Sequence, residues 1–238
     1  MKNKFGIILI KPQLGENIGS SARAMLNFGL TNLRIVKPRD GWPNPRAKAL
    51  ASGAGSVLDN AIVYENVKDS CVDLNYVFAS SARERKLDKE EIPLESSLSE
   101  CQKYFDQGLK VGFLFGPEQS GLSNNDIAFA DKIVFLNTAD SFSSINLSQC
   151  VMLFAYEWFK IRRRGALRNR DKFFYPLAKK EEVNELLIRL NSSLQDSGFF
   201  WPKDKEKSLK LYIDNLFSKL PLNSSDIRFM HGIVRSLS

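Results

Sequence analysis

The chain has 238 residues, of which 43% are hydrophobic and 26% charged, so it holds enough apolar material for a folded core. Its 34 basic and 27 acidic side chains leave a net charge of +7, which favours a polyanionic partner such as nucleic acid. One histidine and three widely spaced cysteines argue against a metal site or a Cys–His nucleophile pair. No apolar run reaches the roughly 18 residues of a membrane span, so we expect a soluble, cytoplasmic protein without metal or membrane contact.

Short apolar runs alternate with helical patterns over the first 160 residues. The runs are continuous rather than alternating, which is typical of strands buried on both faces. They are Phe5–Ile10, Leu33–Val36, Ala61–Tyr64, Tyr76–Ala79, Val111–Phe115 and Lys132–Leu136. The helical patterns between and after them are Ser20–Phe28, Ala47–Ser52, Leu98–Gln107 and a longer one from Asn146 to about Lys160. This alternation predicts an α/β fold with a parallel sheet.

The composition changes beyond this part of the chain. Between Lys160 and Lys172 there are seven basic residues and one acidic residue, and apolar residues become rare. Three amphipathic stripes follow, which begin at Val183, Leu209 and Ile227. We therefore expect an α/β domain over residues 1–160, a basic linker over 161–178 and a small all-helical region over 179–238.

A polar segment, Gly15–Arg23, follows the first predicted strand. Its glycines and Asn17 suit a tight turn, and Ser20 or Ser21 could cap the next helix. We expect Arg23 near the carboxyl end of the strand, where open α/β sheets bind ligands. The alternative is an ordinary strand-to-helix turn with a surface arginine.

Two more polar segments stand at comparable places. Phe115–Leu122 runs from an apolar strand into a turn in which Gly116 could let a ligand approach the backbone and Glu118 supplies a carboxylate. Ser141–Ser148 places several hydroxyls and one amide before a long helix, beside its free N–H groups. A plain turn and a redundant helix cap remain the alternative explanations.

Together, the three segments resemble the three motifs of the SpoU/TrmH branch of SPOUT methyltransferases. Asn17, Gly19 and Arg23 match N-x-G-x-x-x-R; residues 115–122 match F-G-x-E-x-x-G-L; and residues 144–148 match S-[LI]-N-[VL]-S. The resemblance covers about residues 5–160. Within the branch, the chain is most similar to tRNA enzymes that methylate the ribose of nucleotide 32 in the anticodon loop.

The resemblance implies a trefoil-knotted parallel sheet, a homodimer and S-adenosylmethionine (SAM) as cofactor. It implies that Arg23 is catalytic and reaches the partner's SAM site, and that Asn17, Glu118 and Ser144 position the reacting groups. The residues that it assigns to the SAM pocket are Ser80, Ser81, Ala82, Gly116, Leu136, Ser143, Ser144, Ile145, Asn146 and Leu147.

RNA is the expected polyanion. We expect Arg23 to face the RNA, and the basic cluster after Lys160 to contact tRNA phosphates unless it is only a solvated helix end. The basic side chains that we assign to RNA there are Arg162, Arg163, Arg164 and Arg168.

Three other functions stay open at this point. The first is ribose methylation of rRNA or of another tRNA nucleotide, because the motifs serve the shared cofactor and reaction. The second is a non-catalytic RNA-binding protein of the same fold, which the intact Asn17, Arg23, Glu118 and Asn146 argue against. The third is a dinucleotide-dependent oxidoreductase. It is disfavoured because Gly53-Ala54-Gly55 lacks the last glycine of that fingerprint and follows a helical pattern instead of a strand.

Overall fold

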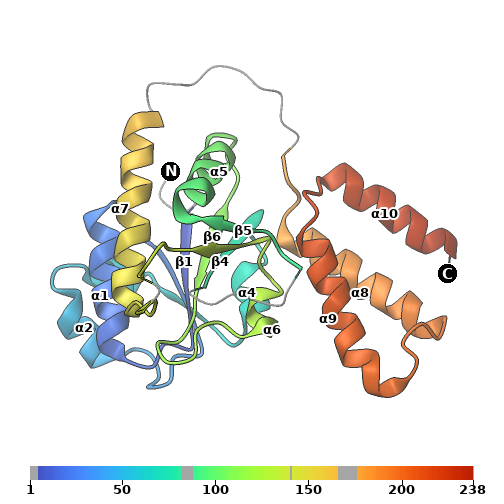
Figure 1. Cartoon of the computed structure of the whole chain (residues 1–238), viewed down its shortest axis with the longest axis horizontal. Helices are drawn as coiled ribbons and strands as arrows, with labels where there is room; N and C mark the ends of the chain where they lie inside the picture. Colours follow the sequence, from blue (N-terminus) through green and yellow to red (C-terminus); the bar gives the residue numbers. More distant parts are fainter. Residues whose placement is uncertain (1–4, 82–87, 140, 166–175, 238) are drawn as a thin grey trace.

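The computed structural model describes residues 5–81, 88–139, 141–165 and 176–237, with 163–165 described by their backbone alone. Its centre is a seven-stranded sheet in the order β3-β2-β1-β6-β4-β7-β5, and every neighbouring pair of strands is parallel (Figure 1). The strands are β1 Phe5–Ile10, β2 Asn32–Val36, β3 Ile62–Tyr64, β4 Tyr76–Ser80, β5 Glu91–Pro93, β6 Val111–Phe115 and β7 Lys132–Phe135. The predicted parallel α/β fold is therefore confirmed.

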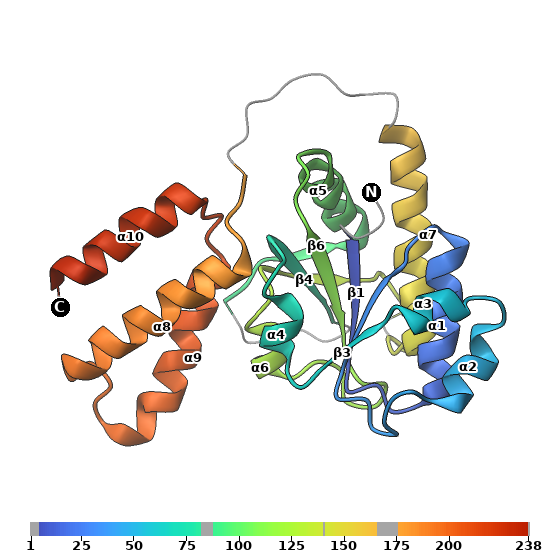
Figure 2. The same ribbon diagram turned by 180° about the vertical axis from the view of Figure 1, so that it is seen from behind.

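Helices cover both faces of this sheet. Those of the α/β part are α1 Gly15–Asn27, α2 Pro45–Ala51, α3 Gly55–Asp59, α4 Val67–Cys71, α5 Leu94–Asp106, α6 Asn124–Ile127 and α7 Leu147–Gly165. Seen from either side, α1, α2 and α7 lie on one face, and α4 and α6 lie on the other (Figures 1 and 2).

The central strands β1 and β6 are apolar throughout because both of their faces are buried. In β1, Ile7 and Leu9 belong to the core beneath α1, α5 and α7, whereas Ile8 and Ile10 belong to the core beneath α4 and α6. Successive side chains of a strand point to opposite faces. In a strand between two helical layers, every side chain is therefore buried, which favours apolar residues at every position. This explains why β1 and β6 begin and end as the apolar runs predict.

The first polar segment is a helix, not the turn that its glycines predict. Helix α1 begins at Gly15, so Asn17 lies in its first turn, and neither Ser20 nor Ser21 caps it. The two glycines serve packing. A Cβ atom at Gly15 would lie 2.2 Å from Asn44 Oδ1, and one at Gly19 would lie 2.1 Å from the Ala47 carbonyl oxygen. The helix at this position is therefore stabilised by contacts with α2, which is distant in sequence. The turn propensity of the two glycines alone predicts a different local structure.

Helix α7 extends to Gly165, beyond its expected end near Lys160. Arg162 explains part of this extension. Its guanidinium lies 4.2 Å from the ring centroid of Phe105 and pairs with Asp106 at 3.3 Å, both on α5. A basic residue that has an aromatic and an acidic neighbour on the adjacent helix can continue a packed helix.

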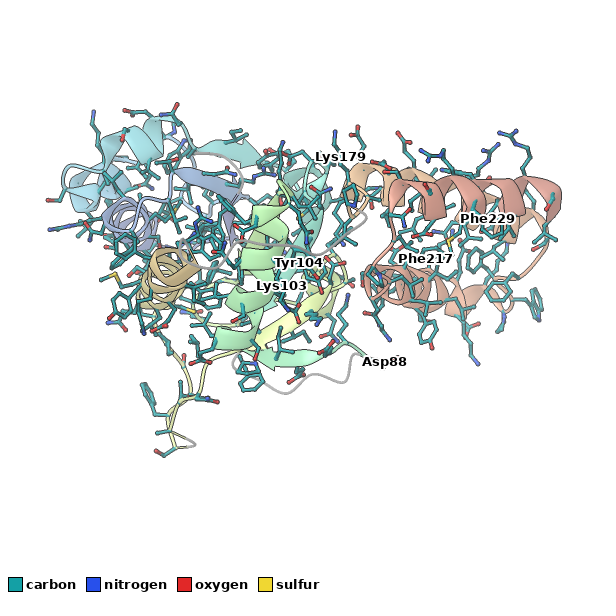
Figure 3. All side chains as sticks on the ribbon, turned by 90° about the horizontal axis from the view of Figure 1, so that it is seen from above. Asp88, Lys103, Tyr104, Lys179, Phe217 and Phe229 are labelled. Atoms are coloured by element: carbon teal, nitrogen blue, oxygen red, sulfur yellow. The ribbon has the colours of Figure 1, made fainter. Side chains whose placement is uncertain are left out.

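Helices α8 Lys180–Asp196, α9 Glu206–Ser218 and α10 Ser224–Leu237, with a 3₁₀ turn at Lys203–Lys205, follow the sheet part. Viewed from above, they lie beside it, with Lys179 at the junction (Figure 3). Asn75 Nδ2 donates to the Leu177 carbonyl at 2.7 Å, and Lys180 forms an ion pair with the buried Asp131. Within the described ranges, we find no helix with the length and apolar character needed to cross a membrane.

Candidate active site

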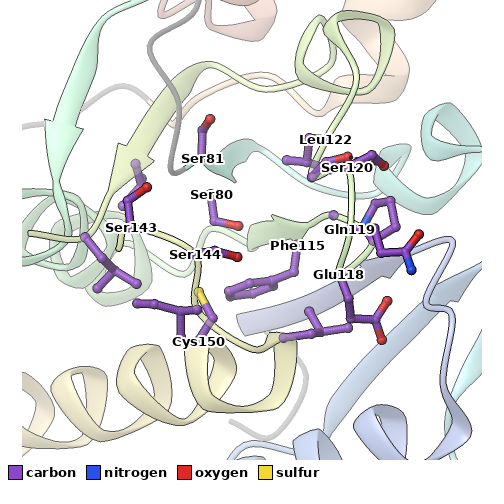
Figure 4. Close-up of a pocket in the computed structure, with 17 residues that line it drawn as sticks. Ser80, Ser81, Phe115, Glu118, Gln119, Ser120, Leu122, Ser143, Ser144 and Cys150 are labelled. Carbon is purple, nitrogen blue, oxygen red and sulfur yellow. Dashed lines mark hydrogen bonds between the residues drawn. The ribbon is translucent and has the colours of Figure 1, made fainter. Parts of the chain in front are cut away.

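A cavity of about 260 Å³ opens at the carboxyl ends of the adjacent strands β6, β4 and β7 (Figure 4). This edge is where parallel α/β sheets bind ligands. The lining comes from four separate segments, which are Ser80–Ser81, residues 115–122, Val134 with Leu136, and the start of α7 with the residues before it (Ser143, Ser144, Ile145, Leu147 and Cys150).

The structure brings together most of the residues that the resemblance assigns to the pocket. Ser80, Ser81, Gly116, Leu136, Ser143, Ser144, Ile145 and Leu147 line the cavity. Asn146 is not among the lining residues, and Ala82 lies outside the described residues.

Eight lining residues were missing from the predicted site residues, and they are Phe115, Pro117, Gln119, Ser120, Gly121, Leu122, Val134 and Cys150. Gln119 and Ser120 stand inside the second motif, at positions where the motif accepts any residue. Val134 lies two residues before Leu136 at the end of β7, and Cys150 lies three residues after Leu147 in α7. Those spacings place each pair on one face of its element, so periodicity around a known pocket residue could have found both.

Gly116 has a structural role in addition to its predicted place in the pocket. A Cβ atom there would lie 2.3 Å from the Leu122 nitrogen and 2.4 Å from the Gly121 carbonyl carbon. The space that a side chain of Gly116 would need is thus filled by the returning chain, so the tight turn itself requires glycine, and the backbone of Gly116 lines the cavity. Gly121 closes the turn, because its N–H donates to the Pro117 carbonyl at 2.8 Å and its φ is +66°.

This turn places Glu118 in a chain of hydrogen bonds. Asn17 Nδ2 donates to Glu118 Oε1 at 2.6 Å, and the Gln13 backbone N–H donates to Oε2 at 2.9 Å. Asn146 Nδ2 in turn donates to Asn17 Oδ1 at 3.0 Å. Because Asn17 is only 7% exposed, its amide depends on these partners for both of its hydrogen-bonding ends. The three predicted motifs are therefore physically joined.

Asn146 also caps α7. Its Oδ1 accepts from the Ser148 backbone N–H at 2.9 Å and from the Ser148 hydroxyl at 2.7 Å. The polar residues before α7 thus have two different roles. Asn146 and Ser148 satisfy the start of the helix, while Ser143 and Ser144 face the cavity.

Arg23 stands apart from the cavity of its own chain. It is exposed on α1, six residues after Asn17, and it does not line the cavity. Within the described part of the chain its guanidinium has no hydrogen-bond or ion-pair partner. Of the other basic residues assigned to RNA, Arg162 is engaged with α5; Arg168 and the side chains of Arg163 and Arg164 lie outside the described residues.

The lining fits the nucleoside part of SAM. Hydroxyls of Ser81, Ser143 and Ser144 and the backbone of residues 115–122 suit a ribose and the edge of a base. Apolar side chains suit the faces of an adenine ring, and they are Leu122, Val134, Leu136, Ile145 and Leu147. No group of three or more potential metal ligands occurs among the described residues.

Known proteins are similar to this chain in sequence and in fold. The model of the SpoU rRNA methylase family matches residues 4–156. TrmJ from Z. mobilis, a solved structure, is 40% identical, with 98% of each chain covered and a TM-score of 0.87. The tRNA (cytidine-2′-O-)-methyltransferase TrmJ of Methanocaldococcus jannaschii is 30% identical over 214 residues, which cover 90% of each protein. The tRNA (cytidine/uridine/adenosine-2′-O-)-methyltransferase TrmJ of Pseudomonas aeruginosa is 26% identical over 98% of this chain and 93% of that protein.

Proposed function

Because the chain belongs to the SpoU rRNA methylase family of SAM-dependent RNA 2′-O-methyltransferases, we propose that it methylates the ribose of tRNA nucleotide 32. The observation that carries this proposal is the meeting of the three motif segments, distant in sequence, at one cavity and in one hydrogen-bond chain. The tRNA substrate is supported by relatives named as tRNA 2′-O-methyltransferases, which align with 90% or more of the chain.

Ser80, Ser81, Gly116, Leu136, Ser143–Ile145 and Leu147 would hold the cofactor. Bound SAM supplies an electrophilic methyl group on a sulfonium. The task left to the protein is to place the ribose 2′-hydroxyl in line and to favour loss of its proton. Since arginine stays protonated, we assign to Arg23 the orientation of the hydroxyl and stabilisation of its developing negative charge. Asn17 and Ser144 position these groups, and Glu118 holds Asn17.

Arg23 is proposed to act in the site of a second copy of the chain. Support comes from an exposed apolar face next to it, where Leu26 of α1 is 37% exposed and Leu153 and Tyr156 of α7 are 40% and 45% exposed. The ring centroid of Phe28, the residue after α1, lies 5.6 Å from that of Tyr156, so these residues form one surface across the two helices. An apolar surface of this kind marks an interface, and a two-fold dimer would give each site an arginine from its neighbour.

The remaining expectations of the family follow as part of the same proposal. We propose that the chain is trefoil-knotted at the cofactor site, which is supported by the return of the chain from β7 to Asn17 beside β1. We also propose a catalytic domain over residues 1–160 and a helical extension over 179–238, joined by a basic linker. Arg162–Arg164 at the end of α7 and Arg168 in that linker are proposed tRNA contacts, and the enzyme is proposed to act in the cytoplasm.

The test is to map ribose methylation on total tRNA after incubation with the purified protein and SAM. A new 2′-O-methyl group at nucleotide 32, absent with an Arg23→Ala protein that still binds SAM, is the expected result. Methylation only at another tRNA nucleotide would contradict the assigned position.

Ribosomal RNA is the second candidate substrate, since the matching family is named for rRNA methylation. Total rRNA is therefore mapped in the same experiment, and methylation of rRNA alone would replace the tRNA assignment. If neither RNA gains a methyl group, calorimetry with SAM separates the remaining cases. A protein that binds no SAM would be a non-catalytic RNA-binding member of the family.

A further inference from the structure

Two lysines occupy an unusual backbone conformation at the edge of the sheet that carries the cavity. Lys11 follows β1 and has φ +47°; Lys37 follows β2 and has φ +46°; each is followed by proline. A positive φ is uncommon for residues other than glycine, asparagine and aspartate, because the Cβ atom crowds the backbone. Ser52, the other non-glycine residue with positive φ in the described ranges, ends helix α2, where this conformation is usual.

The turns at Lys11 and Lys37 form equivalent backbone hydrogen bonds, each to the end of the neighbouring strand. The Lys11 N–H donates to the Val36 carbonyl at 2.7 Å, and the Lys37 N–H donates to the Tyr64 carbonyl at 3.1 Å. Ile10 and Val36 are register partners in β1 and β2, so Lys11 and Lys37 follow at matching positions on adjacent strands. Two cations held at matching positions repel each other unless an anion lies between them.

No acidic side chain in the described ranges supplies that anion. Both lysines are exposed, and neither ammonium has a hydrogen-bond or ion-pair partner in the described part of the chain. A turn that needed only the left-handed conformation would be less strained with glycine or asparagine. The strained conformation thus holds a free positive charge at each of two adjacent strand ends.

This edge is tied to the candidate active site. The Arg39 N–H donates to the Pro12 carbonyl at 3.1 Å, and the next residue, Gln13, donates its N–H to Glu118. A hydrogen bond with Asp40 raises the pKa of Arg39 most, and the charges of Glu118 and Glu16 raise it further, so Arg39 lies in the field of the motif carboxylate. Lys11, Lys37 and Arg39 therefore lie beyond β1 and β2, next to the cavity strand β6, although none of them lines the cavity and Arg39 is paired with Asp40 at 2.8 Å.

We propose that Lys11, Lys37 and Arg39 form a basic edge that binds backbone phosphates of the substrate RNA beside the cofactor cavity. This inference rests on the proposed function and adds a docking site to it. Lysine binds a phosphate as a point charge, and arginine can bind one through two parallel hydrogen bonds. Contacts of this kind position an RNA without reading its sequence.

The test compares the double variant Lys11→Asn/Lys37→Asn with the control Lys11→Arg/Lys37→Arg in the full-length protein. Asparagine tolerates the left-handed conformation, so the asparagine variant should fold, with a Tm equal to or above that of the wild type. Affinity for tRNA is measured across a range of salt concentrations. We expect the dependence of log Kd on log salt to become shallower by about 1 for each lysine replaced by asparagine, and to stay unchanged in the arginine control.

Turnover gives an independent readout. The KM for tRNA should rise roughly tenfold in the asparagine variant, with kcat at saturating tRNA and the Kd for SAM unchanged. An asparagine variant with the wild-type salt dependence and KM would overturn the inference, as would an equal loss in the arginine control. Failure of the proposed function looks different, because in that case the wild-type protein itself would transfer no methyl group to tRNA.

Discussion

Asn146 donates a hydrogen bond to Asn17 across 129 positions of sequence, from the start of α7 to the first turn of α1. The same amide caps α7 through its oxygen and supports Asn17 through its nitrogen. One side chain thus links the helix that borders the cavity to the amide that holds Glu118. The two ends of this amide can be tested separately.

Replacing Asn146 by aspartate should separate the cap from the link. Aspartate still accepts from the Ser148 N–H, so α7 should keep its stability, but it cannot donate to Asn17 Oδ1. We expect a lower Tm, because the buried Asn17 Oδ1 loses its donor, and a kcat at least roughly tenfold lower, because about 1.4 kcal/mol of positioning energy corresponds to a factor of ten. Asn146→Ala is the matched control, and it should lose activity and also about 1 kcal/mol of stability with the cap. An Asn146→Asp enzyme with the wild-type kcat would show that the link to Asn17 is not used.

Subunit mixing can show in which cavity Arg23 acts. Arg23 does not line the cavity of its own chain, whereas Glu118 does. In the proposed dimer, the Arg23→Ala and Glu118→Ala proteins should each be nearly inactive when prepared alone. Co-expressed in equal amounts, they should give heterodimers that keep one site with both groups intact, and thus roughly a quarter of the wild-type activity per subunit. Mixed preparations as inactive as either parent would mean that Arg23 serves its own chain.

Gly116 should tolerate no side chain. In Gly116→Ala the added methyl group would meet the backbone of Gly121 and Leu122 at 2.3 to 2.4 Å, and backbone cannot move aside as a flexible side chain can. We expect a loss of about 1–3 kcal/mol of stability by chemical denaturation, and weaker SAM binding by calorimetry, because the turn lines the cavity.

Gly55→Ala is the control for this substitution. A Cβ at Gly55 meets nothing within 4 Å, and Gly55 is not among the positive-φ glycines, so alanine should be neutral there. If Gly116→Ala were as stable and bound SAM as tightly as Gly55→Ala, the tight turn would not be what requires glycine.

The sequence predicts the parts of this structure that local pattern determines. The apolar runs give β1 and β6 with their observed bounds, because both faces of these strands are buried. Strand β5 is missed because it has three residues, of which only Ile92 is buried, too few to make a pattern. The start of α1 is missed because Gly15 and Gly19 pack against α2, a contact that no local propensity encodes.

In the candidate site, too, some features follow from the sequence and others depend on long-range contacts. Most residues that the resemblance assigns to the pocket do line the cavity, because the resemblance carries positions directly from one protein to another. The bond between Asn146 and Asn17, and the matching turns at Lys11 and Lys37, depend on how distant segments meet. Sequence periodicity does not predict such long-range contacts, so they can be identified only in the folded structure.

Lys89 joins the sheet part to the helical region through a buried amine. Its Nζ donates to the Ala128 carbonyl at 3.2 Å, to the Ala130 carbonyl and to the Ser218 hydroxyl of α9. Burial lowers the pKa of Lys89 to about 7; the charge of Asp131 opposes this shift, and those of Lys180 and Lys219 add to it. Lys219 also pairs with Asp88, which stands at the same junction (Figure 3).

The sign of the resulting pH dependence follows from proton binding. Between the folded pKa of about 7 and the ordinary value of 10.5, the unfolded chain holds a proton on Lys89 that the folded chain has released. The free energy of unfolding should therefore gain from this group as pH rises from 7 to 9, by at most about 1.4 kcal/mol per pH unit. Lys89→Met removes the titration, so the difference in stability between wild type and variant should widen in favour of the wild type over this range. Denaturation at several pH values measures it, and a difference that is constant from pH 7 to 9 would mean that the folded protein keeps Lys89 charged.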